Sequence, residues 1–395
     1  MKDHSLRLVL PSCLSPDSDL LADLSKQTRV KNKACHFLNY LNTTWGDDIR
    51  DYVPVYSPLC KQLYSAEGYL KIRPYLLERG IIESDGKYLV GSEYQKGFSK
   101  SWRITDEFNA DPKAYTIYDQ ALHIKLMKQR EKVIKQYTHF IGRMEQDLRL
   151  IGIPSDMNVE AFMEGLPTQT SNHAKACMIS SIERIRDVQS EIYNTITQGE
   201  KGRYFHKLNN TSKDLRKHLT ISGEPSCEVD VVNCQPLLMA MILQDKRMIQ
   251  SCSEGRFYED LMENSPKSLT RDEMKKSVLC NVIAKCPKVT SKADFEYWHG
   301  KPSDIAFKSA FPEGYSAYEE YRAKHGDLAM IHELQERESE IIHEGALPEI
   351  QKQGVNAVSI HDSFMTSENN AELVADKLRE IFKSESGLSC KVKVA

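Results

Sequence analysis

The stretch "NAVSIHDSFMTSENNAELVADKLREIF" (Asn356–Phe382) joins an apolar run, an ionisable pair and a helical pattern. Residues 357–360 predict a short buried strand. After a polar turn, apolar residues recur at the spacing of one helix face: Leu373, Val374, Leu378 and Phe382. His361 and Asp362 thus stand where a strand leaves the core. Asp362 either shapes a turn or holds a metal ion together with a second carboxylate.

That second carboxylate lies in "CEVDVVNCQPLLMAMIL" (Cys227–Leu243), which predicts a strand and then an apolar helix from Gln235-Pro236. Asp230 is the acid inside the otherwise apolar strand. A buried carboxylate is costly unless it is paired, hydrogen-bonded or bound to a cation. If the two strands are neighbours in one sheet, Asp230 and Asp362 face each other, and two carboxylates suit Mg²⁺.

Between them, "SLTRDEMKKSVLCNVIAKC" (Ser268–Cys286) predicts a helix that begins with a capping box, Thr270 and Glu273. Arg271 and Lys275 are four residues apart and point the same way. Like charges at this spacing destabilise a helix by a few tenths of a kcal/mol, roughly. The pattern therefore favours an anionic ligand such as a triphosphate, and a solvated basic face is the alternative.

In this order the three segments resemble motifs of family A nucleic-acid polymerases. "HDSFMT" (His361–Thr366) is similar to motif C, where phage-type single-subunit RNA polymerases carry His-Asp-Ser-Phe and bacterial DNA polymerase I has His-Asp-Glu. "DVVNCQP" (Asp230–Pro236) is similar to motif A, and "RDEMKKSVL" (Arg271–Leu279) to the start of motif B. The resemblance covers about residues 200–395 and is closest to the phage-type RNA polymerases.

The resemblance implies phosphoryl transfer with two Mg²⁺ ions, Mn²⁺ being the alternative, held by Asp230, Asp362 and the carbonyl of Val231. Lys275 is the third catalytic residue implied. The implied nucleotide-binding residues are Arg271, Lys275, Lys276, Gln235 and Ile283. The implied nucleic-acid-binding residues are Arg203, Arg216, His361 and Gln335. Arg203 belongs to a Gly-Arg pair that resembles a template-contacting signature of the family.

The implied fold is α+β, a right-hand polymerase with an antiparallel palm sheet and helical fingers and thumb. The expected segments are a thumb-like arm (113–199), palm with motif A (200–246), fingers with motif B (247–345) and palm with motif C (346–395). Residues 1–112 are expected to form a small winged-helix-like domain, with a recognition helix near residues 66–79. The expected partners are a DNA template, an RNA or DNA primer, nucleoside triphosphates and other replication proteins.

The chain departs from the family at two positions that bear on substrate choice. It has Ile283-Ala284 where the fingers helix of both subfamilies carries Tyr-Gly. Gln235 stands where DNA polymerase I uses a glutamate to exclude ribonucleotides. The chain also lacks an Asp-x-Glu signature and the length for a 3′–5′ exonuclease domain, so we expect no proofreading.

The front half is less informative. Residues 1–20, rich in Ser, Asp and Pro, predict an irregular lead-in. Residues 79–104 predict a strand, a turn at Asp85-Gly86 and two more strands. Two long helices follow, Leu122 to Leu148 and Met178 to Ile192, and we expect them to form an antiparallel hairpin. The pair is either a purely structural arm or an arm whose basic face follows a phosphate backbone, and the basic residues of the first helix are Lys125, Lys128, Arg130, Lys132 and Lys135.

The composition, with 40% hydrophobic and 28% charged residues among 395, is typical of a soluble protein of two or three domains. No apolar stretch reaches about 18 residues, and the N-terminus lacks signal-peptide features, so we expect a cytoplasmic protein of a bacterial or phage-infected cell. Ten scattered cysteines without a CxxC pair argue against zinc and disulfides.

The sequence therefore favours a DNA-directed nucleotidyltransferase, with RNA or primer synthesis preferred to DNA synthesis. One alternative is a DNA polymerase without proofreading. Another is a replication-initiator DNA-binding protein whose polymerase-like half is inactive, and a third is a metal-dependent nuclease that uses the same carboxylates.

Overall fold

The computed structural model of the protein describes residues 4–25, 28–44, 52–86, 99–168, 170–283, 301–387 and 389–395. It mixes helices and strands, as the α+β prediction requires. Two compact units can be distinguished. The first unit comprises Met1–Tyr137, Arg149–Thr195 and His206–Gly223, and the second unit comprises Thr138–Leu148, Ile196–Phe205 and Glu224–Ala395. No helix among the described residues is long and apolar enough to cross a membrane.

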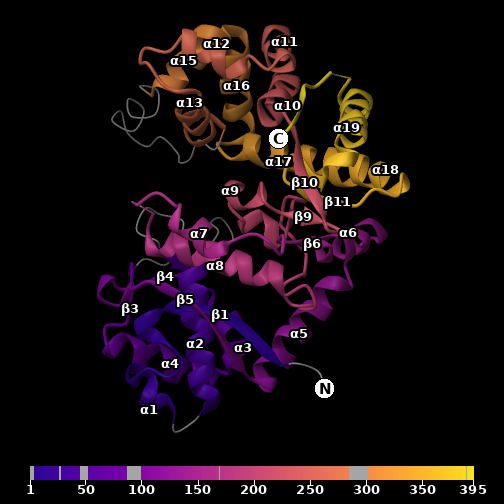
Figure 1. The fold of residues 1–395 in the computed structure, drawn as a ribbon. Coiled ribbons are helices and arrows are strands. Elements are labelled where there is room, and N and C mark those ends of the chain that lie inside the picture. The colour runs from indigo at the N-terminus through magenta and orange to yellow at the C-terminus, as the bar shows by residue number, and fades with distance from the viewer. Residues whose placement is uncertain are drawn as a thin grey trace. The chain divides into compact units, whose positions relative to one another are not determined.

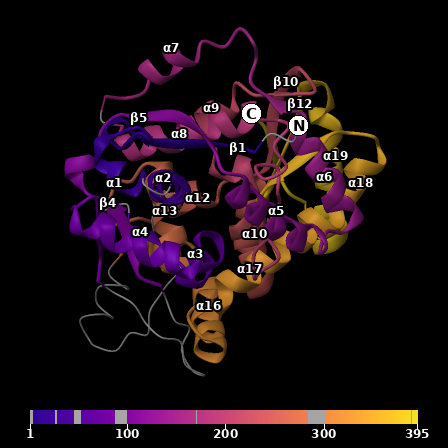
Figure 2. The same ribbon diagram turned by 90° about the horizontal axis from the view of Figure 1, so that it is seen from below.

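The first unit is organised by two antiparallel strands, β1 (Ser5–Pro11) and β5 (Pro112–Tyr118), which lie side by side (Figures 1 and 2). Leu6, Leu8 and Leu10 of β1 are buried. The predicted irregular lead-in is therefore wrong from Ser5 onward, because this alternation of leucines is a strand pattern. Helices α2 (Thr28–Thr43) and α8 (Asn172–Arg186) pack against the strand pair.

Helices α3 (Ser57–Tyr64) and α4 (Ala66–Glu78) accompany a three-stranded sheet of order β2-β4-β3. Its strands are β2 (Val53–Pro54), β3 (Ile82–Ser84) and β4 (Ser101–Ile104). The predicted middle strand near residues 87–91 lies outside the described residues. Two basic residues at α4 are already ion-paired, Lys71 with Glu67 and Arg79 with Asp23. A winged-helix role in DNA binding stays a prediction.

The helical arm differs from its prediction. Instead of one helix from Leu122 to Leu148, the structure has α5 (Gln120–Ile134) and α6 (His139–Arg149). The hydroxyl of Thr138 accepts a hydrogen bond from the amide of Ile141 (3.3 Å), which begins a new helix and interrupts the old one. The compact units do not follow the predicted boundaries at 112 and 199, and the five functional segments stay a prediction.

Short elements complete the first unit: η1 (Ser12–Leu14), η2 (Asp19–Leu21), α1 (Ala22–Ser25), η3 (Asp106–Phe108), β6 (Ile151–Gly152), α7 (Val159–Glu164), η4 (Lys207–Asn210), α9 (Lys213–Arg216) and β9 (Thr220–Ile221). The described cysteines are free thiols, and most of them are buried.

The second unit contains an antiparallel sheet in which β12 (Ser363–Ser367) lies between β10 (Glu224–Val231) and β11 (Ala357–Ile360). β13 (Val392–Val394) pairs with β10. Strands β10 and β11 confirm the sequence prediction. The helix predicted from Leu373 to Phe382 is confirmed, but the sequence analysis missed the strand β12, which comes between the His361-Asp362 turn and that helix. All five residues of β12 are buried, so this strand lacks the polar face that would have marked it.

Helix α19 (Ala371–Ser386) packs on β10 and β12 (Figure 2), and α18 (Leu347–Lys352) packs on β11 (Figure 1). The other helices are α10 (Cys234–Leu243), α11 (Lys246–Glu254), α12 (Phe257–Glu263), α13 (Arg271–Val278), α15 (Pro302–Ala310), α16 (Pro312–His325) and α17 (Ala329–Ser339). Two π-helical segments, η5 (Leu279–Ile283) and η6 (Glu340–Ala346), follow α13 and α17. Shorter elements are β7 (Thr197–Gln198), β8 (Tyr204–Phe205) and η7 (Glu368–Asn370).

Asp147 on α6 connects that helix to the sheet. Its carboxylate accepts a hydrogen bond from the amide of Ala357 at the start of β11 (3.2 Å), and the residue is 2% exposed. Burial raises the pKa of Asp147 from 3.8 to about 6, against the opposing effects of this bond and of Arg143. The stabilisation from the neutral acid is therefore complete below pH 3.8 and is lost as the pH rises through about 6.

We predict that Asp147→Asn raises the free energy of unfolding by roughly 2–3 kcal/mol at pH 8, because the amide keeps the acceptor and cannot ionise. At pH 4 the difference should nearly vanish. Urea unfolding at both pH values measures this. The exposed control Asp156→Asn should change stability by less than about 0.5 kcal/mol at either pH. An equal effect of Asp147→Asn at both pH values would contradict the explanation.

Candidate active site

The turn between β11 and β12 carries His361 and Asp362, and it lies against the end of β10. Ser363 is the register partner of both Ile360 and Asp230. The backbone carbonyl of Asp362 accepts a hydrogen bond from the amide of Val231 (3.3 Å). The structure thus brings the two predicted aspartates to the same end of the sheet, although Asp362 lies in a turn and not in a strand.

The backbone of His361 has a φ of +56°, which lies in the left-handed region. Residues other than glycine adopt this region at some energetic cost. The ring of His361 meets that of Phe205 edge-on, with 6.0 Å between centroids. Such a residue persists only where the surrounding structure holds its backbone in place, and residues of this kind cluster at functional sites.

The electrostatics of the site are dominated by acids. The pKa of Asp362 is raised by burial and then by the charges of Glu338 and Asp230, whereas Lys275 lowers it. The thiol of Cys234 also has a raised pKa, from burial and the same three carboxylates. Carboxylate charges that raise the pKa of a neighbouring buried acid form a region where a cation is stabilised.

Glu338 on α17 is a residue that the sequence reasoning missed. It is 1% exposed, and its two oxygens accept hydrogen bonds from Nε and Nη2 of Arg203, both at 2.8 Å. Nε2 of Gln235, at the start of α10, donates to the same carboxylate (3.2 Å). A charge this deeply buried needs such partners. Met330 and Leu334 are buried on the same face of α17, and Glu338 follows four residues later. An acid on such an apolar face was the sequence signal that could have revealed Glu338.

The residue before Arg203 in the β7–β8 hairpin is a glycine, Gly202. Its φ is +82°, and a Cβ there would lie 2.9 Å from Oγ of Ser339, the residue after Glu338. Only glycine allows the hairpin to approach α17 this closely. Ser339 continues into a buried chain through His343 to Ser359 of β11 (3.0 and 2.9 Å), which ties α17 to the sheet.

A groove of about 410 Å³ lies beside this pair in the second unit, and Arg203 and Gln335 both line it, with Phe205, Lys201 and His332. Because Phe205 also contacts His361, the groove adjoins the β11–β12 turn. Three of the predicted nucleic-acid-binding residues, Arg203, His361 and Gln335, are thus gathered in one region.

Helix α13 begins with the predicted capping box, in which Thr270 and Glu273 exchange hydrogen bonds. Nε of Arg271 donates to Oε1 of Glu259 (2.8 Å), and its guanidinium lies 5.2 Å from the ring centre of Tyr258. Burial raises the pKa of Tyr258, and the charge of Asp362 contributes to the shift. Tyr258 and Glu259 are further residues that the sequence did not reveal. Lys275 and Lys276 are exposed on α13.

Two predicted residues have other surroundings. Arg216 belongs to the first unit, where its buried guanidinium donates to the carbonyl of Thr211 (2.8 Å). Ile283 ends η5 with a fully buried side chain. Their roles in binding stay predictions.

Asn233, between β10 and α10, is a second residue with left-handed backbone (φ 59°, ψ 34°). It is 9% exposed, and in the described part of the chain neither its amide nitrogen nor its amide oxygen has a hydrogen-bond partner. A buried amide without partners is costly and is found where a ligand, ion or water completes the site. The position three residues after Asp230 places this amide at the same end of β10.

The described residues contain no cluster of three or more His, Cys, Asp or Glu side chains arranged to hold a metal ion. No protein-family model and no curated protein matches the chain. Among solved structures, a similar one is the POL domain of Pol1 from M. smegmatis in complex with DNA primer-template and dNTP. The identity is 12% and the TM-score 0.37, over 69% of this chain and 63% of that one, which is too low to establish a common fold.

We predict that Glu338→Ala lowers the free energy of unfolding by roughly 3 kcal/mol, because it leaves the guanidinium of Arg203 without its buried partner. The matched control is Glu336→Ala, which removes the exposed ion pair with Lys201 (2.9 Å) on the same helix and should cost less than about 1 kcal/mol. Urea unfolding compares the two.

A double variant, Arg203→Leu with Glu338→Leu, should be less destabilised than Glu338→Ala, because no charge is then left unpaired. Equal effects of Glu338→Ala and Glu336→Ala would show that the buried pair has no special weight.

Proposed function

We propose that the chain is a template-directed nucleotidyltransferase that extends a 3′-hydroxyl with nucleoside triphosphates. The observation that carries this proposal is the strand register that places Asp230 beside the Asp362 turn, with Lys275 close enough to lower the pKa of Asp362. Two acids and a cation at one end of a sheet suit the transfer of a phosphoryl group, whose charge must be balanced from both sides.

The residues at this end of β10 fit magnesium. Asp230, Asp362 and the carbonyl of Val231 supply hard oxygen ligands, and the unpartnered amide of Asn233 adds a further oxygen. Burial and then the charges of Glu338 and Asp230 raise the pKa of Asp362, and a divalent ion would relieve this surplus of negative charge. Two bound Mg²⁺ ions would activate the attacking hydroxyl and neutralise charge on the leaving pyrophosphate.

The side chains around the acids have distinct roles in this proposal. Lys275 donates a proton to the leaving pyrophosphate and balances its charge. Arg271, held by Glu259, binds the terminal phosphates, with Lys276 as a helper. Gln235 contacts the nucleotide from the α10 side.

On the other side, the groove with Arg203, His361 and Gln335 receives the primer–template end. The buried carboxylate of Glu338 holds the guanidinium of Arg203 through two hydrogen bonds, and Arg203 lines the groove. The form of the reaction that we propose is RNA or primer synthesis on a DNA template, as the His-Asp-Ser-Phe sequence implies.

We predict that the protein with Mg²⁺ extends a primed or unprimed DNA template, and that Asp230→Asn and Asp362→Asn each lower the rate by about 10³-fold or more. The assay uses ribo- and deoxyribonucleoside triphosphates in separate reactions, so that the sugar preference is measured directly. Glu224→Gln, an exposed acid on the same strand β10, is the control and should keep the wild-type rate.

Absence of synthesis with every template and nucleotide would refute the proposal. DNA cleavage without nucleotides would favour the nuclease, and tight DNA binding without either reaction would favour the initiator.

We also predict that Lys275→Ala lowers kcat by about 10²-fold with little change in KM, because its charge acts mainly in the transition state. Arg271→Ala should instead raise KM for the triphosphate, because Arg271 binds the ground state as well. Lys324→Ala, an exposed lysine on α16, should leave both parameters unchanged. Steady-state kinetics distinguish these patterns, and a Lys275→Ala enzyme with wild-type kcat would remove this residue from the mechanism.

A further inference from the structure

In the first unit, the start of β1 and the start of α5 bring two histidines together. The strand register pairs Ser5 with Tyr118, and α5 begins two residues later at Gln120. His4, directly before β1, therefore lies beside the first turn of α5, which carries His123. Their rings meet edge-on, with 5.1 Å between centroids. The two histidines are far apart in the sequence, so no local spacing indicates the pair.

The separation of these two rings matches that of two imidazoles bound to one metal ion. With metal–nitrogen bonds of about 2.0–2.1 Å, two imidazoles at a tetrahedral angle have centroids roughly 5 Å apart. The observed centroids are 5.1 Å apart. Aromatic pairs without an ion have centroids roughly 4.5–7 Å apart, so the groups around the pair decide its chemistry.

One nitrogen of the pair lacks the partner that a buried polar atom needs. Nδ1 of His4 is shielded from solvent and, within the part of the chain that the structure describes, has no hydrogen-bond partner. A buried polar atom in this state is costly, and a bound ion or water is a common explanation. An ion that accepts the lone pair of this imidazole would remove the cost.

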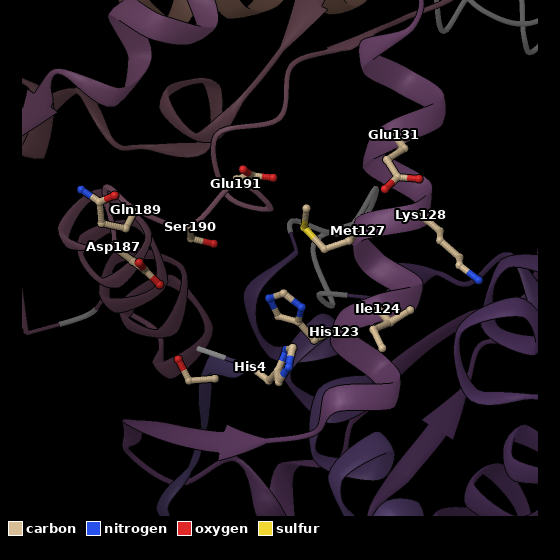
Figure 3. Close-up of a pocket in the computed structure, with 11 residues that line it drawn as sticks. His4, His123, Ile124, Met127, Lys128, Glu131, Asp187, Gln189, Ser190 and Glu191 are labelled. Carbon is tan, nitrogen blue, oxygen red and sulfur yellow. The ribbon is translucent and has the colours of Figure 1, made fainter. Parts of the chain in front are cut away.

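Met127 adds a sulfur atom to the pair. It follows His123 by four residues, so both side chains lie on one face of α5. Figure 3 shows them in a cavity of about 480 Å³ that His4 also lines, whereas Lys128 extends away from the rings. His4, His123 and Met127 are each partly buried. With a thioether as third ligand, this set differs from the clusters of His, Cys, Asp or Glu that the described residues lack.

The lining of the cavity is acidic on balance. Glu131, Asp187 and Glu191 contribute carboxylates, and Lys128 is a basic residue on the rim. The Glu191 carboxylate lies 3.9 Å from Nη1 of Arg130, so Glu131 and Asp187 remain against one lysine. A cleft with a surplus of one charge concentrates ions of the opposite charge. The cavity therefore favours a cation.

The wall opposite α5 is fixed in place by hydrogen bonds. The Tyr193 hydroxyl accepts from the amide of Arg7 (2.9 Å) and donates to its carbonyl (3.1 Å), which ties this segment to β1. Nε of Arg130 donates to the carbonyl of Glu191 (2.9 Å), which ties it to α5. Asn194, fully buried, donates to two carbonyls of the same segment (3.2 and 2.8 Å). A cavity built in advance lowers the cost of binding.

We propose that His4, His123 and Met127 bind a Cu(I) ion. Imidazole suits copper and zinc alike, but a thioether is a soft ligand that selects Cu(I). The volume of the cavity leaves room for a water or another small ligand on the ion, as in sites with an open coordination position. All three residues belong to the first unit. The site uses no residue of the candidate active site and goes beyond the proposed function.

The test is a competition for Cu(I) between the full chain and the chelator bicinchoninate, under anaerobic conditions. Accessible thiols are first alkylated with iodoacetamide, because thiolates also bind Cu(I). Among the described residues no cysteine lines the cavity, so alkylation should leave the site intact. The test variants are His4→Gln, His123→Gln and Met127→Leu. A parallel titration with Zn²⁺ measures the preference for the softer ion.

The matched controls carry the same substitutions elsewhere in the chain. His139→Gln/His218→Gln removes two exposed imidazoles, and Met157→Leu removes a partly buried thioether. Both controls should bind Cu(I) within about twofold of wild type, because surface changes away from a site have small effects. Near-ultraviolet circular dichroism should show that every variant keeps the wild-type fold.

We expect His4→Gln and His123→Gln each to bind Cu(I) at least about 100-fold more weakly, since losing a group that only supports a ligand already costs 10–100-fold. Met127→Leu should bind Cu(I) about tenfold more weakly and Zn²⁺ within about twofold of wild type, because only the soft ligand is lost. Equal Cu(I) affinities of the test and control variants would overturn the proposal, as would tighter binding of Zn²⁺ than of Cu(I) by the wild type.

A second measurement uses the ion itself as the probe. X-ray absorption of Cu(I) bound to the alkylated wild-type chain should show nitrogen neighbours and one sulfur neighbour, and the sulfur should disappear in Met127→Leu. A sulfur signal that persists in this variant overturns the assignment of Met127. Asp362→Asn should bind Cu(I) like wild type, so the proposed reaction and this site fail independently.

Discussion

The buried carboxylate of Glu338 is the constraint on which the rest of the site depends. It receives Arg203 from the β7–β8 hairpin and Gln235 from α10, and its charge reaches Asp362 in the β11–β12 turn. Three segments that are far apart in the chain are therefore positioned against one atom group. Because a buried charge tolerates few geometries, α17 cannot shift without disturbing all of them.

Close backbone approaches complete this arrangement. Gly202 lets the hairpin approach α17, and the turn at His361 and the start of α10 at Asn233 use left-handed residues that carry side chains. Each lies within a few residues of a proposed functional group. The energetic cost of unfavourable backbone conformations is thus concentrated around the acids. The packing of the sheet and helices, including β12 with all its residues buried, offsets this cost.

The sequence allowed much of the second unit to be predicted, because acids inside apolar runs are conspicuous. Asp230 and Asp362, strands β10 and β11, and the cap of α13 all followed from local patterns. Glu338 is likewise an acid among apolar residues, on one face of the helix α17. It is less conspicuous in the sequence, because Arg and Glu are common on helices. The pairing of β1 with β5 joins residues more than a hundred positions apart, and the interruption of the arm depends on one hydroxyl at Thr138. Neither has a strong local signal.

The compact units are interleaved along the polypeptide. Thr138–Leu148 and Ile196–Phe205 belong to the second unit but are enclosed in sequence by the first, which resumes at His206. On the ribosome, neither unit can be finished until Gly223 has emerged, and the helix that contributes Asp147 must wait for a strand synthesised some two hundred residues later. No single proteolytic cut can release an intact half, so subcloning at one boundary would yield two incomplete pieces.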